Sequence, residues 1–254
     1  TLEGELNAAP DGRASLVTAE DLEQMLGAVT EYSRYACIET LRQGFLPLRG
    51  GFRLGVCGSA VVREGEVSNL KEISSLSLRI VCEEVGLGSG IAPQLFDESG
   101  QFLSTLILSP PGGGKTTLLR DLIRSLSLGD SEHRALRVAV IDERGEIAVC
   151  CKARPQMELG NHTDVLSLCP KATGIMMVLR GMNPQLIAVD EITAAEDIRA
   201  MCLAANCGVG LLASIHAASA EELTQKPLFE ELLRAKVFRR KICLFRKSFQ
   251  SFVQ

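Results

Sequence analysis

A glycine-rich segment constrains the fold of this chain more than any other feature. Residues 109–116 read Ser-Pro-Pro-Gly-Gly-Gly-Lys-Thr. A β-prone run at residues 102–108 precedes this segment, and apolar residues at helical spacing follow it over residues 118–126. A strand, a glycine loop and a helix in this order distinguish a phosphate-binding P-loop from an ordinary glycine turn with a solvated lysine. The segment therefore predicts a nucleotide site built into an α/β sheet.

The residue types in this loop suit the binding of ATP and Mg²⁺. Glycines let consecutive backbone N–H groups converge on phosphate oxygens, and the start of the helix adds its positive end. Lys115 is predicted to reach the β and γ phosphates, and the Thr116 hydroxyl to coordinate Mg²⁺. Ser109 stands where the full pattern has glycine, so we expect it to alter the loop geometry or the affinity. The predicted nucleotide-binding residues are Pro111, Gly112, Gly113, Gly114, Lys115, Thr116 and Thr117.

Two apolar strands after the loop end in acidic pairs. Asp142 and Glu143 close the first, and Asp190 and Glu191 close the second. P-loop ATPases need an acidic strand tip for the magnesium shell and a base that orients water. We assign Asp190 to the metal and Glu191 to the base, because the second strand commonly returns beside the P-loop strand. Asp142 is predicted as a further metal ligand and Glu143 as a further catalytic residue, and which pair supplies the base stays open.

A histidine ends another apolar run on the same expected edge of the sheet. His216 closes residues 211–216, and ligands of open α/β sheets bind at the carboxyl ends of the strands. We therefore predict that His216 senses the γ-phosphate. The alternative is a histidine with a purely structural role.

The pattern along the chain predicts two domains. Residues 1–90 are expected to form a small α+β domain, with a helix from Thr18 to about Leu41 and then short strands. Residues 91–100 are expected to form a linker, within a stretch rich in glycine and proline. Residues 101–254 alternate apolar strands with helices, which predicts a mostly parallel sheet.

Composition narrows the possible partners and location. Lys plus Arg number 27 against 31 Asp plus Glu, and the chain has two Tyr and no Trp, so no nucleic-acid partner is expected. The nine cysteines show no CxxC pair, so neither a disulfide framework nor a zinc site is expected. We see no run of about 20 apolar residues and no signal-peptide pattern at the start, which predicts a cytoplasmic protein.

The order of these motifs resembles that of a known family. The P-loop at 109–116, the acidic pair at 142–143, the strand 186–191 and the strand 210–216 occur in the order seen in the traffic ATPases of type II and type IV secretion and of twitching pili. Their fold is a RecA-like P-loop domain preceded by a small α+β domain.

A narrower resemblance covers nearly the whole chain. The strings at residues 50–58, 72–75, 78–80, 141–146 and 214–217 are similar to those of the stage III sporulation AA family of endospore-forming bacteria, whereas the match beyond residue 238 is loose. This resemblance implies a homo-oligomeric, hexameric ATPase that works with membrane proteins of a secretion-like complex. It also implies a position at the inner membrane on the mother-cell side, and export toward the forespore.

The resemblance also implies where a catalytic arginine comes from. Hydrolysis in this fold usually needs a positive charge opposite the lysine. Arg144 is expected to point beyond its strand end, and Arg180 precedes its strand by several residues. The family supplies such arginines from the N-terminal domain, partly across a subunit boundary, which makes Arg79 and Arg53 the candidates. Strand alternation predicts both on the exposed face, opposite their apolar neighbours, and the alternative is an ordinary solvated strand arginine.

Other functions stay open at this level. A nucleic-acid-binding P-loop ATPase would share the same motifs, and a nucleotide-dependent scaffold with negligible turnover would share the same loop. The basic segment at residues 234–247 is expected to form a final core strand with solvated charges. Contact with acidic lipid or a membrane partner is the alternative for this segment.

Overall fold

The computed structural model describes most of the chain, in two compact units. The described residues are 17–30, 37–42, 44–80, 83–217, 219–225, 227–245 and 248–253. The first unit is Thr1–Val81 and the second is Cys82–Gln254. In the part of the chain that the structure describes, no helix is both long enough and apolar enough to cross a membrane.

Helix α1 (Ala19–Val29) of the first unit begins where the sequence predicts. The Thr18 hydroxyl accepts from the Asp21 backbone N–H, and the Asp21 side chain accepts from the Thr18 N–H at 2.8 Å, which forms a capping box. The prediction that this helix continues to about Leu41 is wrong. The helix ends at Val29, where the hydroxyl of Thr30 donates to the Leu26 carbonyl at 2.9 Å and so satisfies one group of the last turn. A separate short helix, α2 (Ile38–Arg42), follows.

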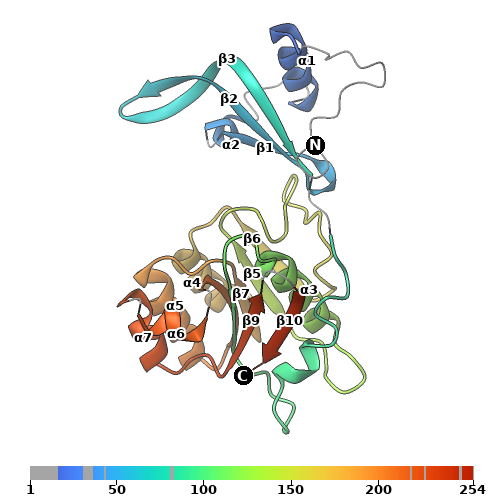
Figure 1. Ribbon diagram of the computed structural model, residues 1–254, viewed down its shortest axis with the longest axis vertical. Coiled ribbons are helices and arrows are strands. Elements are labelled where there is room, and N and C mark those ends of the chain that lie inside the picture. The colour runs from blue at the N-terminus through green and yellow to red at the C-terminus, as the bar shows by residue number, and fades with distance from the viewer. Residues whose placement is uncertain are drawn as a thin grey trace. The chain divides into compact units, whose positions relative to one another are not determined.

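The first unit also contains a three-stranded antiparallel sheet (Figure 1), in the order β1 (Phe45–Pro47), β2 (Arg53–Arg63) and β3 (Glu66–Arg79). Its turns are formed at glycines. Positive φ angles occur at Gly50 and Gly51 in the 3₁₀ helix η3 (Arg49–Gly51), and again at Gly65 between β2 and β3. The helices pack on one face of the sheet through a small core of Leu26, Leu41, Leu46, Leu54, Val56 and Ile73.

The second unit is built on a seven-stranded sheet, as the alternating pattern predicts. The strand order is β10-β9-β4-β8-β7-β5-β6, and every neighbouring pair is parallel except β10 with β9. The strands are β4 (Thr105–Ser109), β5 (Val138–Asp142), β6 (Thr163–Ser167), β7 (Leu186–Val189), β8 (Gly210–His216), β9 (Arg240–Phe245) and β10 (Ser248–Val253). The basic segment near the end thus contributes β9 beside the P-loop strand. Strand β6 was not predicted from the sequence, because this half-buried outer strand carries too few apolar residues to show a pattern.

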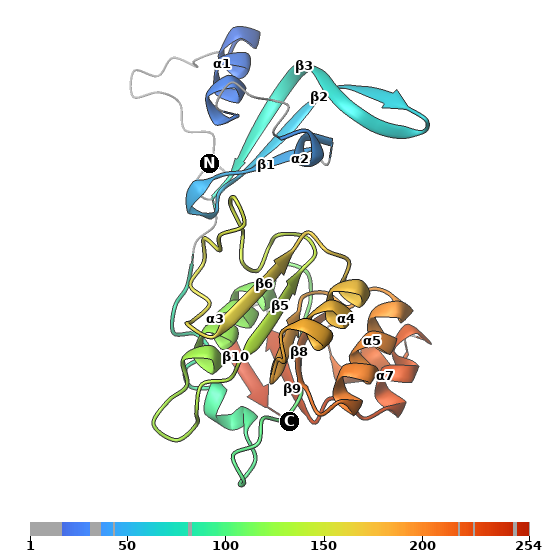
Figure 2. The ribbon, with the colours of Figure 1, turned by 180° about the vertical axis from the view of Figure 1, so that it is seen from behind.

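Helices cover both faces of this sheet (Figures 1 and 2). Helix α3 lies on one face, and α4, α5 and α7 lie on the other. Alternation along β4 shows why two cores form: Leu106 and Leu108 join the core under α4 and α5, while Ile107 joins the core under α3. The helices are α3 (Lys115–Leu128), α4 (Lys171–Gly181), α5 (Ala195–Asn206), α6 (Ala220–Thr224) and α7 (Glu230–Arg234), with 3₁₀ turns η4 (Ala92–Leu95) and η5 (Pro227–Phe229).

The glycine-rich stretch before β4 packs against helix α3. The carboxylate of Asp121 accepts from the backbone N–H groups of Gly86 at 3.0 Å and Gly88 at 2.6 Å. Burial raises the pKa of Asp121, but these hydrogen bonds and Arg124 outweigh it and hold the pKa below its usual value. Residues 91–100, the expected linker, are part of the second unit, and Leu95 is fully buried there.

Candidate functional site

The P-loop connects strand β4 to helix α3 as the sequence predicts. Strand β4 ends at Ser109, and α3 begins at Lys115 with Gly114 as its N-cap residue. Gly112 and Gly114 have φ angles of 73° and 86°, which a side chain would disfavour. No described side chain caps α3 at Gly114, so the N–H groups of its first turn stay available for phosphate oxygens.

The serine at the start of the loop fits beside a glycine. Ser109 is fully buried as the last residue of β4, and its hydroxyl donates to the Pro110 carbonyl at 2.9 Å. A Cβ atom on Gly113 would lie only 2.0 Å from the Ser109 Oγ atom. The loop therefore accommodates this orientation of the Ser109 hydroxyl because residue 113 has no side chain.

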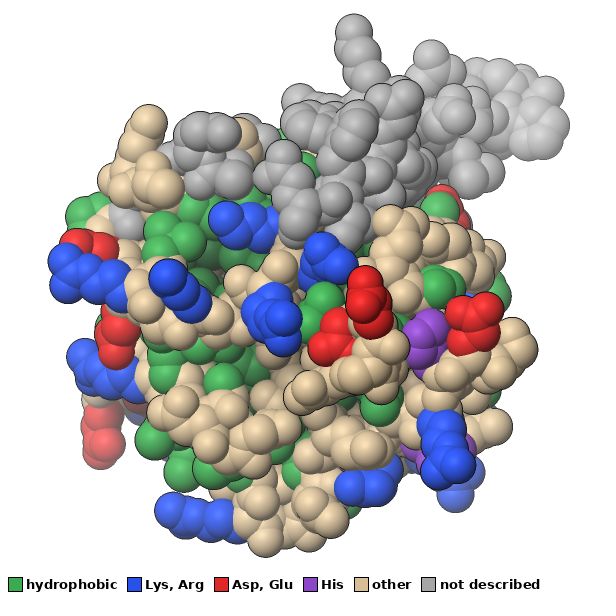
Figure 3. Space-filling model, turned by 90° about the horizontal axis from the view of Figure 1, so that it is seen from below, with side chains coloured by type: hydrophobic (Ala, Val, Ile, Leu, Met, Phe, Trp, Pro, Cys, Tyr) green, Lys and Arg blue, Asp and Glu red, His purple; other side chains and the backbone are tan. Residues whose placement is uncertain are grey.

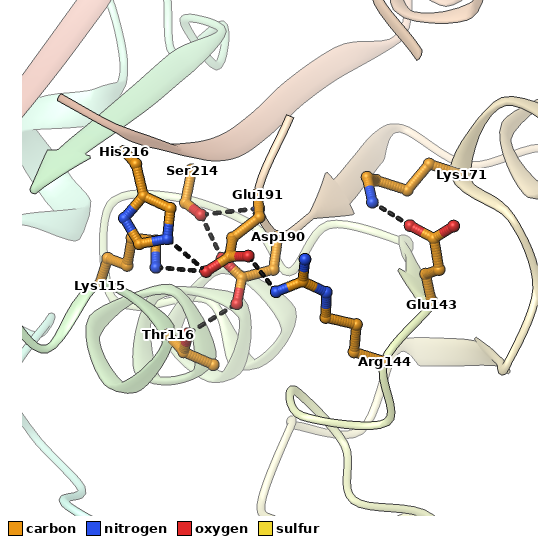
Figure 4. Close-up of polar contacts among 9 residues, drawn as sticks. All are labelled: Lys115, Thr116, Glu143, Arg144, Lys171, Asp190, Glu191, Ser214 and His216. Atoms are coloured by element: carbon orange, nitrogen blue, oxygen red, sulfur yellow. Dashed lines mark hydrogen bonds and ion pairs between the residues drawn. The ribbon is translucent and has the colours of Figure 1, made fainter. Parts of the chain in front are cut away.

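An aspartate and two hydroxyl groups meet beside the first turn of α3 (Figure 4). The Thr116 hydroxyl donates to Asp190 Oδ2 at 2.6 Å, and the Ser214 hydroxyl donates to Asp190 Oδ1. Hydroxyl and carboxylate oxygens are the hard ligands that Mg²⁺ takes, so Thr116 and Asp190 fit this ion. Ser214 is a site residue that was not predicted from the sequence, although alternation along β8 places it on the same face as His216.

A single carboxylate, Glu191, joins three basic side chains. Its Oε1 atom lies 2.8 Å from Lys115 Nζ and 2.7 Å from His216 Nε2, and its Oε2 atom accepts from Arg144 Nη1. Burial would raise the pKa of Glu191, but Lys115, Arg144 and His216 outweigh it and hold the pKa below its usual value. The backbone of Glu191 has a φ of 51°, a region that residues at functional sites often occupy. The structure thus brings the predicted base, the P-loop lysine and the predicted sensor together.

The expected direction of Arg144 is wrong. The Arg144 side chain was predicted to point beyond the end of β5, but it turns back toward Glu191 (Figure 4). The cause is the turn that follows β5, in which Gly145 has a φ of 65° and its N–H donates to the Asp142 carbonyl at 3.3 Å. This turn sends the chain back over the edge of the sheet.

The other acidic pair is engaged elsewhere. Asp142 is buried, and its two oxygens accept from the backbone N–H groups of Glu146, Ile147 and Ala148 at 2.8–3.1 Å. Glu143 pairs with the buried Lys171 at the start of α4. Both residues line a small hollow with Asp190 and Glu191. Their predicted roles as metal ligand and catalytic residue stay predictions, and Asp142 first serves to hold its own loop.

The predicted neighbour of the P-loop strand is wrong. Strand β7, which Asp190 and Glu191 directly follow, does not lie beside β4, because β8 lies between them. The pair still reaches the P-loop because the parallel strands all end at one edge of the sheet.

The remaining predicted residues lie at three places. Thr117 follows Thr116 in α3 and is half-buried, and Pro111 is exposed on the loop. Arg79 is exposed at the end of β3 in the first unit, where it is the cross-strand partner of Arg53. Alternation does not bury its apolar neighbours as expected, since Leu78 is 52% exposed. Arg53 lies over the Phe45 ring, 3.5 Å from its centroid.

A larger hollow lies at the opposite edge of the sheet, where the strands begin. Its volume is about 640 Å³, and its lining includes Arg137, Lys236 and Arg239. It is separate from the P-loop and is not the nucleotide site.

Seen from below (Figure 3), the described Lys and Arg side chains are dispersed among apolar and acidic ones rather than gathered in a stripe.

Comparisons with known sequences place the chain among sporulation proteins. A family model described as "Sporulation stage III, protein AA" matches residues 3–251. The chain is 39% identical over 229 residues to Stage III sporulation protein AA of Bacillus subtilis (strain 168), which covers 90% of this chain and 74% of that protein.

Comparisons with solved structures identify the fold. The ATPase DotB of Legionella pneumophila is similar with a TM-score of 0.55 and 21% identity, over 89% of this chain. The pilus retraction motor PilT with bound ADP gives 0.55 and 17%, over 88% of this chain. The chain spans 64% of the length of each of these solved chains. The predicted fold class, a RecA-like P-loop domain after a small α+β part, is confirmed.

Proposed function

The chain belongs to the sporulation stage III protein AA family, and on this basis we propose that it is a Mg²⁺-dependent ATPase, the motor of a secretion-like membrane complex that acts during sporulation. The observation that carries this proposal is the pair of contacts between the P-loop helix and the end of β7. Lys115 meets Glu191 at 2.8 Å, and Thr116 meets Asp190 at 2.6 Å. A phosphate-binding lysine and a magnesium-type hydroxyl thus lie directly beside two carboxylates.

Each of these side chains has a role in the proposed reaction. Lys115 binds the phosphates, and Thr116 and Asp190 hold Mg²⁺, which when bound would neutralise charge on the phosphates. Glu191, whose carboxylate is ionised at neutral pH, orients the attacking water and accepts its proton. His216, on the same Glu191 oxygen as Lys115, is placed to report whether that lysine has moved to the phosphates.

The proposed assembly is a homo-oligomeric ring, with six subunits as the expected number. In such a ring Arg79 of one subunit would reach the nucleotide of its neighbour and stabilise charge on the γ-phosphate. Family membership supports a place beside membrane proteins of the sporulation complex, on the mother-cell side of the inner membrane. Movement of the two units relative to each other is the proposed output of hydrolysis.

The test is ATP hydrolysis by the purified chain over a range of protein concentrations. Specific activity should rise with concentration as rings form, and Lys115→Ala should be inactive. Mixing Lys115→Ala with Arg79→Ala should restore part of the turnover, because some interfaces then pair an intact loop with an intact arginine. Absence of hydrolysis at every concentration would refute the ATPase. Activity that is independent of concentration, without rescue in the mixture, would refute the role of Arg79 across subunits.

A further inference from the structure

Arg144 covers the solvent side of the cluster formed by Lys115, Glu191 and His216. Its side chain is 56% exposed, whereas the side chains of its partner Glu191 and of Lys115 are 12% and 7% exposed. Lys115 takes one oxygen of Glu191 and Arg144 takes the other. The two basic groups are therefore separated only by the width of one carboxylate.

The backbone that carries Arg144 is held firmly from within. Asp142 binds three backbone N–H groups of the loop that follows. Arg120, a buried residue of α3, donates to the carbonyls of Ile147 at 2.8 Å and Glu146 at 2.9 Å. Because α3 is also the P-loop helix, these hydrogen bonds tie the loop to the phosphate site. The long, exposed side chain of Arg144 extends from that loop.

Lys115 and Arg144 share one anion, so binding of phosphates at the loop affects both. A nucleotide that draws Lys115 toward its phosphates removes the lysine from Glu191. A terminal phosphate of a nucleoside triphosphate brings more negative charge than the carboxylate, and the fork of a guanidinium matches phosphate oxygens. A γ-phosphate bound beside Lys115 would therefore compete with Glu191 for Arg144.

We propose that Arg144 is a nucleotide-sensing arginine of its own subunit, which clamps Glu191 before ATP binds and transfers to the γ-phosphate once Lys115 has moved. The proposal rests on the proposed ATPase function and deepens it. Once Arg144 has moved to the γ-phosphate, Glu191 is free to act as the base. The water oxygen bonds to the terminal phosphorus, the bond from that phosphorus to the bridging oxygen breaks with its electron pair on ADP, and Glu191 takes the water proton. ADP has no γ-phosphate, so Arg144 stays paired with Glu191 when ADP is bound.

The test compares two nucleotides in the presence of Mg²⁺, ADP and a non-hydrolysable ATP analogue. The wild-type chain, Arg144→Ala and Arg144→Lys are titrated at protein concentrations low enough to keep subunits apart. The control is Arg180→Ala, which removes an exposed arginine from the last turn of α4. Wild type should prefer the analogue, and Arg144→Ala should lose about tenfold to a hundredfold of that preference. Arg144→Lys should keep part of it, and Arg180→Ala should keep all of it.

The outcomes separate this inference from the proposed function. An unchanged preference in Arg144→Ala overturns the role of Arg144 even if the wild type hydrolyses ATP. An equal weakening for both nucleotides also overturns it, because that result describes a damaged pocket. Loss of preference in a chain that binds but never hydrolyses ATP supports the sensing role and refutes the ATPase. A wild type that binds neither nucleotide overturns both.

Discussion

Glu191→Gln should bind ATP more tightly than the wild type while losing turnover. Lys115 lies 2.8 Å from Glu191, so binding of phosphates by this lysine must compete with the ion pair. An amide keeps the shape of the carboxylate but holds the lysine less strongly and no longer repels the incoming phosphates. It also cannot accept a proton from water, so hydrolysis should fall by about a hundredfold or more.

The size of the affinity gain follows from the geometry of the pair. The Lys115 and Glu191 side chains are 7% and 12% exposed, so solvent screens their attraction little. A hydrogen bond to a charged group contributes about 1.5–3 kcal/mol, roughly twice the contribution of a neutral one. The substitution should therefore lower the free energy needed to separate Lys115 from residue 191 by about 1 kcal/mol. This change corresponds to about fivefold tighter binding of ATP.

The assay is a calorimetric titration with ATP and Mg²⁺, with turnover measured on the same samples. Glu143→Gln is the matched control, because Glu143 pairs with Lys171 and not with the P-loop lysine. It should leave the affinity unchanged and show the smaller loss of turnover. Unchanged or weaker binding by Glu191→Gln would refute the competition for Lys115. A larger loss of turnover in Glu143→Gln would place the base on β5.

Two further substitutions test the loop and its support. Gly113→Ala should weaken nucleotide binding, because its Cβ would lie 2.0 Å from Ser109 Oγ and force the hydroxyl or the loop to shift. Ser109→Gly in the same chain should restore part of the binding, and no recovery in the double variant would contradict this packing. Asp121→Asn should reduce the free energy of unfolding at neutral pH by about 1–3 kcal/mol, since a neutral side chain holds Gly86 and Gly88 less well. Because the folded-state pKa of Asp121 is lowered, its contribution is present above about pH 4 and is lost as the pH falls through the folded-state pKa. Urea unfolding at several pH values should therefore show the difference narrowing in acid, and equal stability at neutral pH would contradict the role.

Several features of the fold follow from local sequence and needed no structure. The loop at 109–116 can be identified as a phosphate loop from its own residues, because few other backbones place three glycines and a lysine between a strand and a helix. The capping box at Thr18 and the Gly50-Gly51 turn are local in the same way. The limits of local sequence show at the helix that ends at Val29, since the apolar pattern continues past a residue whose hydroxyl closes the helix.

Which residues form the site could be predicted from the sequence, but which of them contact one another is known only from the tertiary structure. That Glu191 and His216 would lie near the loop follows because parallel strands end at one edge. That Glu191 is shared by Lys115, His216 and Arg144 depends on the order of the strands and on one turn after β5, which no residue spacing encodes. Sequence sets which chemical groups end each strand, because alternation and turn residues act over a few positions. Which group meets which is decided by how distant strands are ordered in the sheet and by which way each loop then turns.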